Sequence, residues 1–326
     1  MNTRTILFCS AVSLLAVYVY LNNQQLHANN PAPQTCHLHF MKNLSVCRPV
    51  CPNGTFFLMG MQTCQPWLNC NAKITLMETI STSVVKTVFL AKWEKYEVVL
   101  SVLNSKLYEK DFQQNLFMIK ALNGNYTVQL VGFCKNNIIT EFYALGNALN
   151  VNYHLRHSFR TYDSVKLRLD LCINYAAIIN FLHSSPVGNR VMCDSNSLEK
   201  TLSQFLITDD FRIVVNDLDA TPEVTYVSGE EKGVICGNKA LEGSFVAPEQ
   251  LWPYEQKFDP KILPRYNEKT DIFKIPDVCN WFLGNLADAS KYKLFNFHKR
   301  CKNRDPSKRP SAKHVLEMYN NIRNDL

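Results

Sequence analysis

The pattern of apolar residues changes part-way along this chain, from the spacing of strands to the spacing of helices. Val84–Leu90 and Tyr96–Leu100 are rich in β-branched and aromatic residues, which predicts two strands. The charged stretch Lys92–Lys95 separates them, so we expect an antiparallel pair. From about Val165 onward, helical spacing dominates. A strand-rich first part followed by a helical second part predicts two lobes of one α+β domain.

One helix is predicted among the strands of the first part. Its apolar residues recur at Leu107, Phe112, Leu116, Ile119 and Leu122. The helix is expected to close near Asn123–Gly124, before strands at Val128–Phe133 and Ile138–Phe142. In the helical part, short runs around Val191 and Ile213–Val215 have the character of strands.

The N-terminal segment indicates the compartment. Residues 6–21 are almost wholly apolar and carry no charge, and Arg4 stands just before them. At about 1.5 Å per residue this helix would span roughly 24 Å, slightly less than a ~30 Å hydrocarbon layer. A cleaved signal peptide is the alternative, but Leu26–Ala28 places a large residue where the cleavage site needs a small one. We therefore predict an uncleaved anchor with residues 1–5 in the cytosol and the remainder in the lumen.

The chain has 12 cysteines, and five of them crowd into a short stretch after the linker: Cys36, Cys47, Cys51, Cys64 and Cys70. Their spacing lacks the C-x-x-C pairs and nearby histidines of a zinc site, so disulfides are the better interpretation. The stretch is too short for a core of its own, and we expect it to be stapled onto the main domain. The cysteines of the main domain are interpreted mostly as buried thiols, with one further bridge.

The remaining composition narrows the class of protein. Charged residues make up 19% and hydrophobic residues 46%, which excludes a long disordered chain. The charge excess, 35 − 28 = 7, is modest and lacks a long basic run, so no nucleic-acid partner is predicted. Glycosylation sequons at Asn43, Asn53 and Asn125 agree with a secretory lumen.

Short motifs follow one another through the chain in a fixed order: Asp194, Asp217–Asp219, Ala247–Glu249, Asp271–Phe273 and Asp305–Pro310. This order resembles that of the protein-kinase family, with its catalytic-loop Asp, metal-binding D-F-G, A-P-E, helix-F Asp and a late Arg that pairs with A-P-E. The resemblance implies a bilobal protein-kinase-like fold with a β-rich N-lobe and a helical C-lobe. The chain is then divided into a cytosolic tail (1–5), a transmembrane signal-anchor (6–21), a luminal linker and Cys-rich segment (22–73) and the kinase-like domain (74–326).

Four stretches are more specific: residues 64–70, 185–196, 216–220 and 245–254. They closely resemble the protein O-mannose kinases, a family of secretory-pathway membrane enzymes, and the resemblance runs from about Cys51 to the end. It implies ATP with Mg²⁺ or Mn²⁺ as cofactors. It also implies transfer to the 6-hydroxyl of mannose in a GalNAc-GlcNAc-Man trisaccharide on α-dystroglycan, by a single-pass type II protein of the endoplasmic reticulum membrane.

The kinase resemblance also implies which residues of the C-lobe carry out the chemistry. Asp194 takes the place of the catalytic base, and Asp217 that of the D-F-G aspartate, which ligates Mg²⁺ through oxygen. The second metal ligand is left open between Glu199, at the usual Asn position, and Asn196. The Arg that normally precedes the base is replaced by Cys193, so we predict activity without a phosphorylated activation loop.

The nucleotide-binding elements depart from the kinase pattern. The glycine-rich motif aligns with residues 81–88, which contain no glycine, and the V-A-I-K lysine is replaced by Ser101. Val99 in that motif is still assigned to the nucleotide site. By ordinary kinase criteria the protein would be inactive, which keeps open a catalytically silent pseudokinase that acts as a binding scaffold. A luminal kinase for protein side chains or another glycan is a third hypothesis.

Lys86 offers a replacement cation. Side chains alternate along a strand, so Lys86 points the same way as Val88, which aligns with the residue that covers adenine. One ammonium–phosphate contact at ~4 Å is of the order of 4 kcal/mol before desolvation at an effective dielectric of about 20. Glu141 matches the hinge, whose backbone meets adenine, with no specific role expected for its side chain. The helix-C glutamate position falls on Asn115, so a partner for Lys86 stays unassigned.

Overall fold

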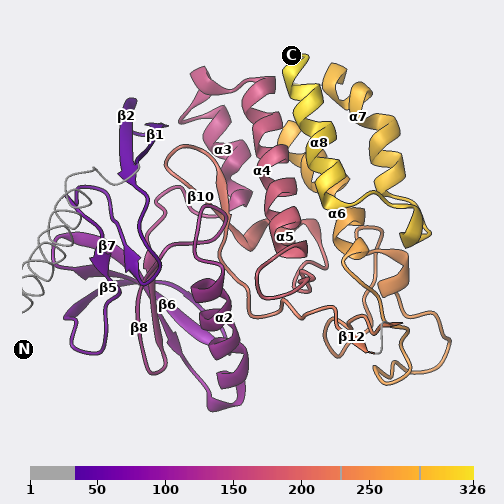
Figure 1. The fold of residues 1–326 in the computed structure, drawn as a ribbon, viewed down its shortest axis with the longest axis horizontal. Coiled ribbons are helices and arrows are strands. Elements are labelled where there is room, and N and C mark those ends of the chain that lie inside the picture. The colour runs from indigo at the N-terminus through magenta and orange to yellow at the C-terminus, as the bar shows by residue number, and fades with distance from the viewer. Residues whose placement is uncertain (1–33, 228–229, 286–287) are drawn as a thin grey trace, which may run out of the picture.

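The computed structural model describes residues 34–227, 230–285 and 288–326. The predicted cytosolic tail and anchor lie outside these ranges. Within them, no helix combines the length and the apolar character that crossing a membrane requires. Figure 1 shows the strands of the N-terminal lobe on one side and most of the helices on the other, which fits the predicted kinase-like α+β arrangement.

The N-terminal lobe is built on a five-stranded antiparallel sheet in the order β5-β6-β7-β9-β8. Its strands are β5 (Ile74–Thr82), β6 (Lys86–Trp93), β7 (Tyr96–Leu103), β8 (Leu130–Cys134) and β9 (Asn137–Glu141). The predicted antiparallel pair is confirmed as β6 and β7, and the predicted helix as η1 (Lys106–Tyr108) followed by α2 (Glu109–Ala121). β5 was not predicted, because it is an edge strand with nearly every side chain exposed and so lacks the alternation that marks a half-buried strand.

The two faces of this sheet have different neighbours. Ala91, Val98 and Leu100 lie in a buried cluster with Phe56 and other residues of the Cys-rich segment, which therefore covers the outer face. That segment contains the short pair β3 (Thr55–Phe56) and β4 (Gln65–Pro66). The opposite face carries the side chains of Lys86, Val88 and Val99.

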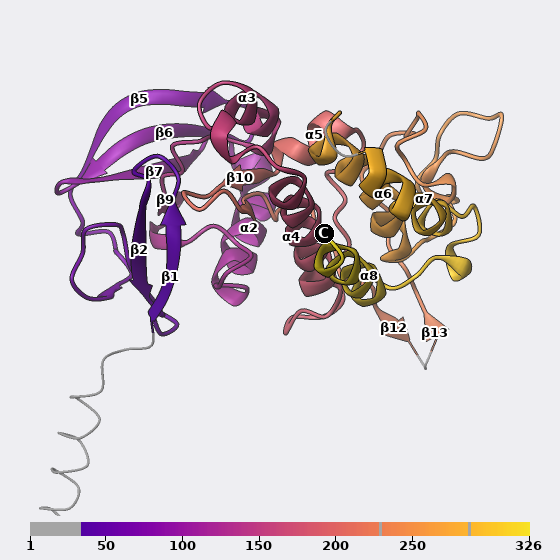
Figure 2. The same ribbon diagram turned by 90° about the horizontal axis from the view of Figure 1, so that it is seen from above.

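A hairpin of β1 (Gln34–His39) and β2 (Leu44–Pro49) forms the first part of the Cys-rich segment, and Arg48 of β2 reaches Glu141 at the end of β9 (Figure 2). The predicted bridges in this region are Cys36–Cys47 and Cys51–Cys64. A third, Cys70–Cys134, joins the segment to β8 and confirms the predicted staple.

The prediction of buried thiols in the main domain was wrong. Two more disulfides, Cys172–Cys279 and Cys193–Cys236, lie within the C-terminal lobe, and among the described residues only Cys301 is a free cysteine. Their partners are 107 and 43 residues apart in the sequence. Pairing at such separations leaves no spacing motif, so it cannot be deduced from the sequence.

The C-terminal lobe is mainly helical. Its helices are α3 (Val151–Arg156), α4 (Val165–His183), α5 (Leu198–Ser203), α6 (Lys269–Leu283), α7 (Asp288–Cys301) and α8 (Ala312–Asn324), with 3-10 turns η2 (Ala148–Asn150), η3 (Arg160–Tyr162), η4 (Pro248–Gln250) and η5 (Pro306–Lys308). Its short strands are β10 (Phe205–Ile207), β11 (Ile213–Val215), β12 (Tyr226–Val227) and β13 (Glu230–Glu231). The predicted strand at Val191 is wrong: this residue lies in a loop, where its N–H donates to the Pro222 carbonyl at 3.1 Å.

Two of the landmark residues are held by specific contacts, of which the resemblance implied one, the pairing of Arg309. Arg309 pairs with Glu249 of the Ala247–Glu249 motif, with a shortest N–O distance of 2.5 Å. Asp271, buried in α6, accepts hydrogen bonds from the Met192 N–H at 3.0 Å and from His183 at 3.2 Å. Arg309 also donates to the carbonyl of Lys269, the first residue of α6, at 2.9 Å, so Asp271 and Arg309 both connect neighbouring segments to this helix.

Candidate active site

At the boundary between the lobes, a cationic side chain of the sheet lies next to a carboxylate of the C-terminal lobe. Lys86 is the first residue of β6, and Asp217 follows β11 by two positions. The Lys86 Nζ lies 3.3 Å from both carboxylate oxygens of Asp217. The two side chains are 18% and 21% exposed, so the pair is partly shielded from water but open to a ligand.

The register of the sheet places the other predicted nucleotide residues. Val88 lies opposite Ser101 on β7, and Val99 on the same strand lies opposite Thr140 on β9. Because cross-strand partners share a face and side chains alternate, Val88 and Val99 lie on the face from which Lys86 projects. Ser101, which stands at the usual lysine position, pairs with Val88 and so lies on the same face as Lys86.

The glycine-free loop between β5 and β6 is closed by its own side chains. The Ser83 Oγ accepts hydrogen bonds from the backbone N–H groups of Val85 (3.2 Å) and Lys86 (3.1 Å). The Asn104 Nδ2 donates to the Ser83 carbonyl at 2.7 Å. These backbone donors are already engaged, so they are not available to cradle phosphate as a glycine-rich loop does.

Asp194 lies in the loop before α5 and is held by two side chains of that region. Its Oδ2 is 2.7 Å from the Lys200 Nζ and accepts a hydrogen bond from the Gln204 Nε2 at 3.3 Å. Lys200 was missed by sequence reasoning. The available signal is Ser197, which caps α5 by accepting from the Lys200 N–H and so fixes the helical turn that carries this lysine.

The two candidates for the second metal ligand differ little in their surroundings. Asn196 and Glu199 are both exposed, and the side chain of neither forms a hydrogen bond or ion pair with another described residue. Both oxygen donors are thus available to a cation. Among the described residues, neither side chain is hydrogen-bonded to Asp217, so the structure does not choose between them.

The acidic residues near Lys86 are crowded. Burial and the neighbouring Asp217 carboxylate raise the pKa of Asp219 to about 6, Asp194 and Asp111 add to the effect, and Lys86 opposes it. In the described part of the chain, no three His, Cys, Asp or Glu side chains already form a metal site. The excess of carboxylate oxygens around Asp217 nevertheless fits a hard divalent cation, which would offset their repulsion.

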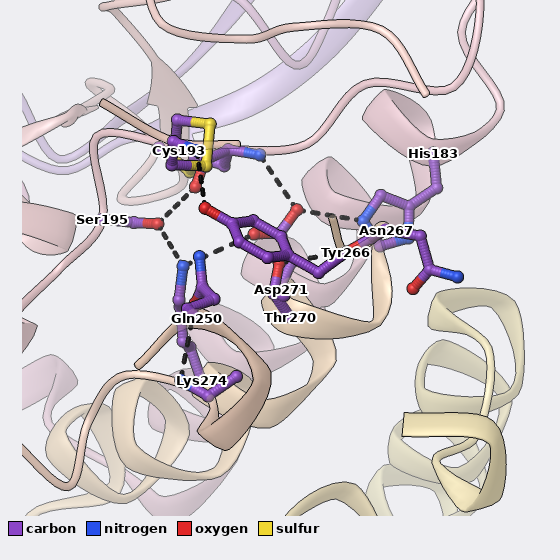
Figure 3. The surroundings of a disulfide bond; sticks show 12 residues. His183, Cys193, Ser195, Gln250, Tyr266, Asn267, Thr270, Asp271 and Lys274 are labelled. Carbon is purple, nitrogen blue, oxygen red and sulfur yellow. Dashed lines mark hydrogen bonds and ion pairs between the residues drawn. A yellow bond between two sulfur atoms is a disulfide. The ribbon is translucent and has the colours of Figure 1, made fainter. Parts of the chain in front are cut away.

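The loop that carries Asp194 is fixed on its far side (Figure 3). Cys193 forms a disulfide with Cys236 of the segment between Asp217 and Ala247, and the Cys236 N–H donates to the Tyr266 hydroxyl at 2.5 Å. In the position of the missing arginine, a covalent bond thus ties the catalytic loop to the activation segment.

A buried lysine supports the same loop from α6. The Lys274 Nζ donates to the Ser195 Oγ at 2.6 Å and lies 3.7 Å from the Asp271 Oδ1. Burial lowers the pKa of Lys274, although Asp271 and Glu249 oppose the shift. Ser195 in turn donates to the Met192 carbonyl. The residues on both sides of Asp194 are therefore anchored in the core.

Helix α2 contacts the Asp217–Asp219 motif through an amide side chain. The side-chain Oδ1 of buried Asn115 accepts a hydrogen bond from the Leu218 N–H at 2.9 Å. Asn115 occupies the position where kinases place the glutamate of helix C, and Asp217, not a helix residue, is the partner of Lys86. The helix thus positions the backbone beside Asp217.

The side chain of Glu141 has a role that was not expected. In the sheet register Glu141 lies opposite Val98, so its side chain points to the covered face, away from Lys86. There it is buried and pairs with Arg48 of β2 at 2.8 Å, and Arg48 also binds Asp209 of the C-terminal lobe at 2.7 Å. Arg48 was missed because no local motif links it to the hinge. We name the contacts of Arg48 with Glu141 and Asp209 the hinge brace.

Comparison with curated proteins identifies close relatives. The chain is 43% identical to the protein O-mannose kinase of Homo sapiens over 286 residues, which are 85% of this chain and 81% of the human protein. It is 44% identical to that of Gallus gallus over 284 residues, 84% of this chain and 80% of the relative. Identity to that of Xenopus laevis is 40% over 285 residues, again 84% and 80%. No family model matches the chain.

Proposed function

This chain belongs to the protein O-mannose kinase family, and from that premise we propose that it transfers the γ-phosphate of ATP to the 6-hydroxyl of an O-linked mannose. The proposed acceptor is the GalNAc-GlcNAc-Man trisaccharide on α-dystroglycan, which the sequence resemblance implies. As a kinase, the protein uses ATP with a divalent metal ion, for which we propose Mg²⁺ or Mn²⁺.

In the proposed reaction, Asp194 is the general base. Its carboxylate takes the proton of the acceptor hydroxyl while that oxygen bonds to the γ-phosphorus and the bond to the ADP oxygen breaks. Lys200 and Gln204 orient this carboxylate. Asp217, with Asp219 and with Asn196 or Glu199, would hold the cation, which offsets phosphate charge when bound.

The position of Lys86 carries this proposal. A scaffold without catalytic function has no need for an ammonium group 3.3 Å from the D-F-G aspartate, on the same face as Val88 and Val99. The geometry supports a nucleotide site in which Lys86 replaces the cation that Ser101 cannot supply. Glu141 is proposed to serve through its hinge backbone only.

The test is phosphorylation of a synthetic O-mannosyl glycopeptide by the purified chain with Mg²⁺–ATP. Asp194→Asn should reduce turnover by about 10²–10⁴-fold, because general-base catalysis contributes that much, while Mg²⁺–ATP still raises the melting temperature. Absence of both transfer and thermal shift in the unaltered protein would favour the pseudokinase scaffold. Phosphate found on the peptide, or only on a different glycan, would favour the third hypothesis.

We also propose that the protein is a single-pass type II protein of the endoplasmic reticulum membrane, with residues 6–21 as its anchor. The five disulfides among the described residues support an oxidising compartment. Resistance of the full chain to carbonate extraction, with its N-terminus intact by mass spectrometry, is the expected result. A free, shortened chain would instead indicate a cleaved signal peptide.

A further inference from the structure

A sequon of the Cys-rich segment lies in a well-formed turn. The Thr55 N–H donates to the Pro52 carbonyl at 3.2 Å, and Gly54 has φ +87°, so Pro52–Thr55 is a turn with glycine at the position that requires positive φ. Asn53 is exposed, and its Oδ1 accepts from the Gly54 N–H at 3.0 Å. Its Nδ2 donates to no other described residue, so the nitrogen that a glycan would modify is free.

A groove begins at this asparagine. It has a volume of about 440 Å³ and is lined by Asn53, Trp67 and one side of α2, including Phe117 and Lys120. Phe117 is 50% exposed although it is a large apolar residue. The Lys120 Nζ lies 4.2 Å from the centre of the Phe133 ring and 6.0 Å from that of Trp67. An aromatic wall beside a cation and amides suits a sugar, which has apolar C–H faces and polar hydroxyl edges.

We propose that Asn53 is N-glycosylated and that the first sugar of its glycan packs in the groove between Trp67 and α2. In the covalent step, the Asn53 Nδ2 bonds to C1 of the first sugar of a polyprenyl-diphosphate-linked oligosaccharide. The bond from C1 to the diphosphate oxygen breaks, the diphosphate leaves with the electron pair, and the amide loses one proton. The Trp67 N–H donates to the Gly54 carbonyl at 3.0 Å, which fixes the turn beside the groove.

The proposed sugar would contact the element that supports the metal-binding motif. Leu116 and Phe117 follow Asn115 in α2, and Leu116 also lines the groove. Asn115 holds the Leu218 N–H from the inner side of the same helix. A glycan packed on the outer side would therefore stabilise α2 between the Cys-rich segment and the catalytic site. Like the proposed function, this glycosylation requires that the protein enters the lumen, but it does not depend on the kinase reaction.

Site occupancy is tested on the full chain from cells that make only oligomannose glycans. Peptide-N-glycosidase in heavy-oxygen water should convert Asn53 to labelled Asp, and Asn53→Gln should abolish this signal. Thr55→Ser keeps the sequon and should keep the glycan. An unlabelled Asn53 would overturn the proposal, whatever the kinase activity of the preparation.

Packing is tested by trimming the glycan on the folded protein. An endoglycosidase that leaves one sugar on each asparagine should leave the melting temperature unchanged, whereas complete removal should lower it by about 1–2 °C, the shift that ~1 kcal/mol produces in a protein of this size. Asn53→Gln should reproduce that loss, and the matched variant Asn125→Gln should not. In the Phe117→Ala variant, complete removal of the glycan should lower the melting temperature by less than in the unaltered protein. Equal melting temperatures for the trimmed, stripped and intact protein would overturn the packing.

Discussion

The two halves of the active site are held in different ways. The lower half, around Asp194, is anchored by the Cys193–Cys236 disulfide and by the buried Lys274–Ser195 contact. The upper half supplies Lys86 from the start of β6, next to exposed residues 81–84, and this lysine is held by one partly exposed ion pair with Asp217. The lower half is therefore fixed by covalent and buried contacts, and the upper half by one partly exposed contact.

This difference separates two tasks of a phosphoryl transfer site. A general base has to be in place before the acceptor arrives, because small errors in position reduce the rate strongly. A cation that binds a flexible triphosphate gains from some freedom to move. The contrast predicts that changes in the upper half mainly affect nucleotide binding, and that changes in the lower half mainly affect turnover.

Replacement of Lys86 by methionine should have the largest effect. It keeps the length of the side chain but removes the only cation that pairs with Asp217 among the described residues. Loss of even ~3 kcal/mol of the contact energy with phosphate corresponds to about a 100-fold weaker affinity for ATP. The measurement is the Kd for Mg²⁺–ATP, together with kcat at saturating nucleotide.

Ser101 offers a matched rescue of that variant. It lies opposite Val88 on the same face of the sheet, at the position where other kinases carry their lysine. Lys86→Met combined with Ser101→Lys should recover part of the ATP affinity. Unchanged affinity in Lys86→Met alone would show that the upper half does not work through this cation.

Removal of the Cys193–Cys236 bridge should lower turnover more than nucleotide affinity. We expect about a tenfold fall in kcat for Cys193→Ser with Cys236→Ser, because Asp271 and Lys274 still hold the loop. A bridge of this kind typically contributes about 2–4 kcal/mol to the free energy of unfolding. Steady-state kinetics and limited proteolysis of the activation segment measure the two effects.

The Cys172–Cys279 bridge is the control, since it joins α4 to α6 in the core of the same lobe. Replacing this pair by alanine should reduce stability without a specific fall in kcat at temperatures where the protein stays folded. If both pairs lower kcat equally, the bridge next to Asp194 acts through general stability and not through the position of the base.

Changes in the hinge brace should have a smaller effect on nucleotide binding, because the brace lies on the opposite face of the sheet from Lys86. Arg48→Met leaves the buried Glu141 without its cation, which costs about 3 kcal/mol in comparable broken pairs. We expect a lower melting temperature and a KM for ATP raised a few-fold, with kcat little changed. Adding Glu141→Gln removes the stranded charge and should restore part of the stability. A normal KM in the single variant would argue against coupling between the brace and the hinge.

The sequence predicted most of the lower half because its groups belong to short motifs. Asp194, Asp217, Asp271 and the Glu249–Arg309 pair follow one another in a fixed order, and their roles depend on local loops and one central helix. Strand alternation also predicted the direction of Lys86. In each case the information lies within a few residues of the functional group.

The parts that sequence reasoning missed depend on contacts between distant segments. Arg48 meets Glu141 across 93 residues, and Cys193 meets Cys236 across 43. Lys200 is closer to Asp194, but only the start of α5 at Leu198 decides that its side chain turns back to the base. Such contacts follow from the fold and not from any local pattern.

A histidine far from both halves should have the smallest effect on turnover at neutral pH. His298 is buried on α7, where its Nε2 lies 2.8 Å from the Tyr319 hydroxyl on α8, and burial together with Lys302 lowers its pKa from 6.5 to about 4. Between these values the unfolded chain binds a proton that the folded protein excludes, so the free energy of unfolding falls as the pH falls from 6.5 to 4. The full difference corresponds to about 3 kcal/mol. His298→Gln should flatten the decline of melting temperature between pH 7 and 5 without changing kcat at pH 7, whereas the exposed His314→Gln should leave the decline unchanged. If the melting temperature of His298→Gln still declines between pH 7 and 5, other groups cause the acid sensitivity. If kcat at pH 7 falls in this variant, the lower half of the site depends on packing well beyond its disulfide and α6.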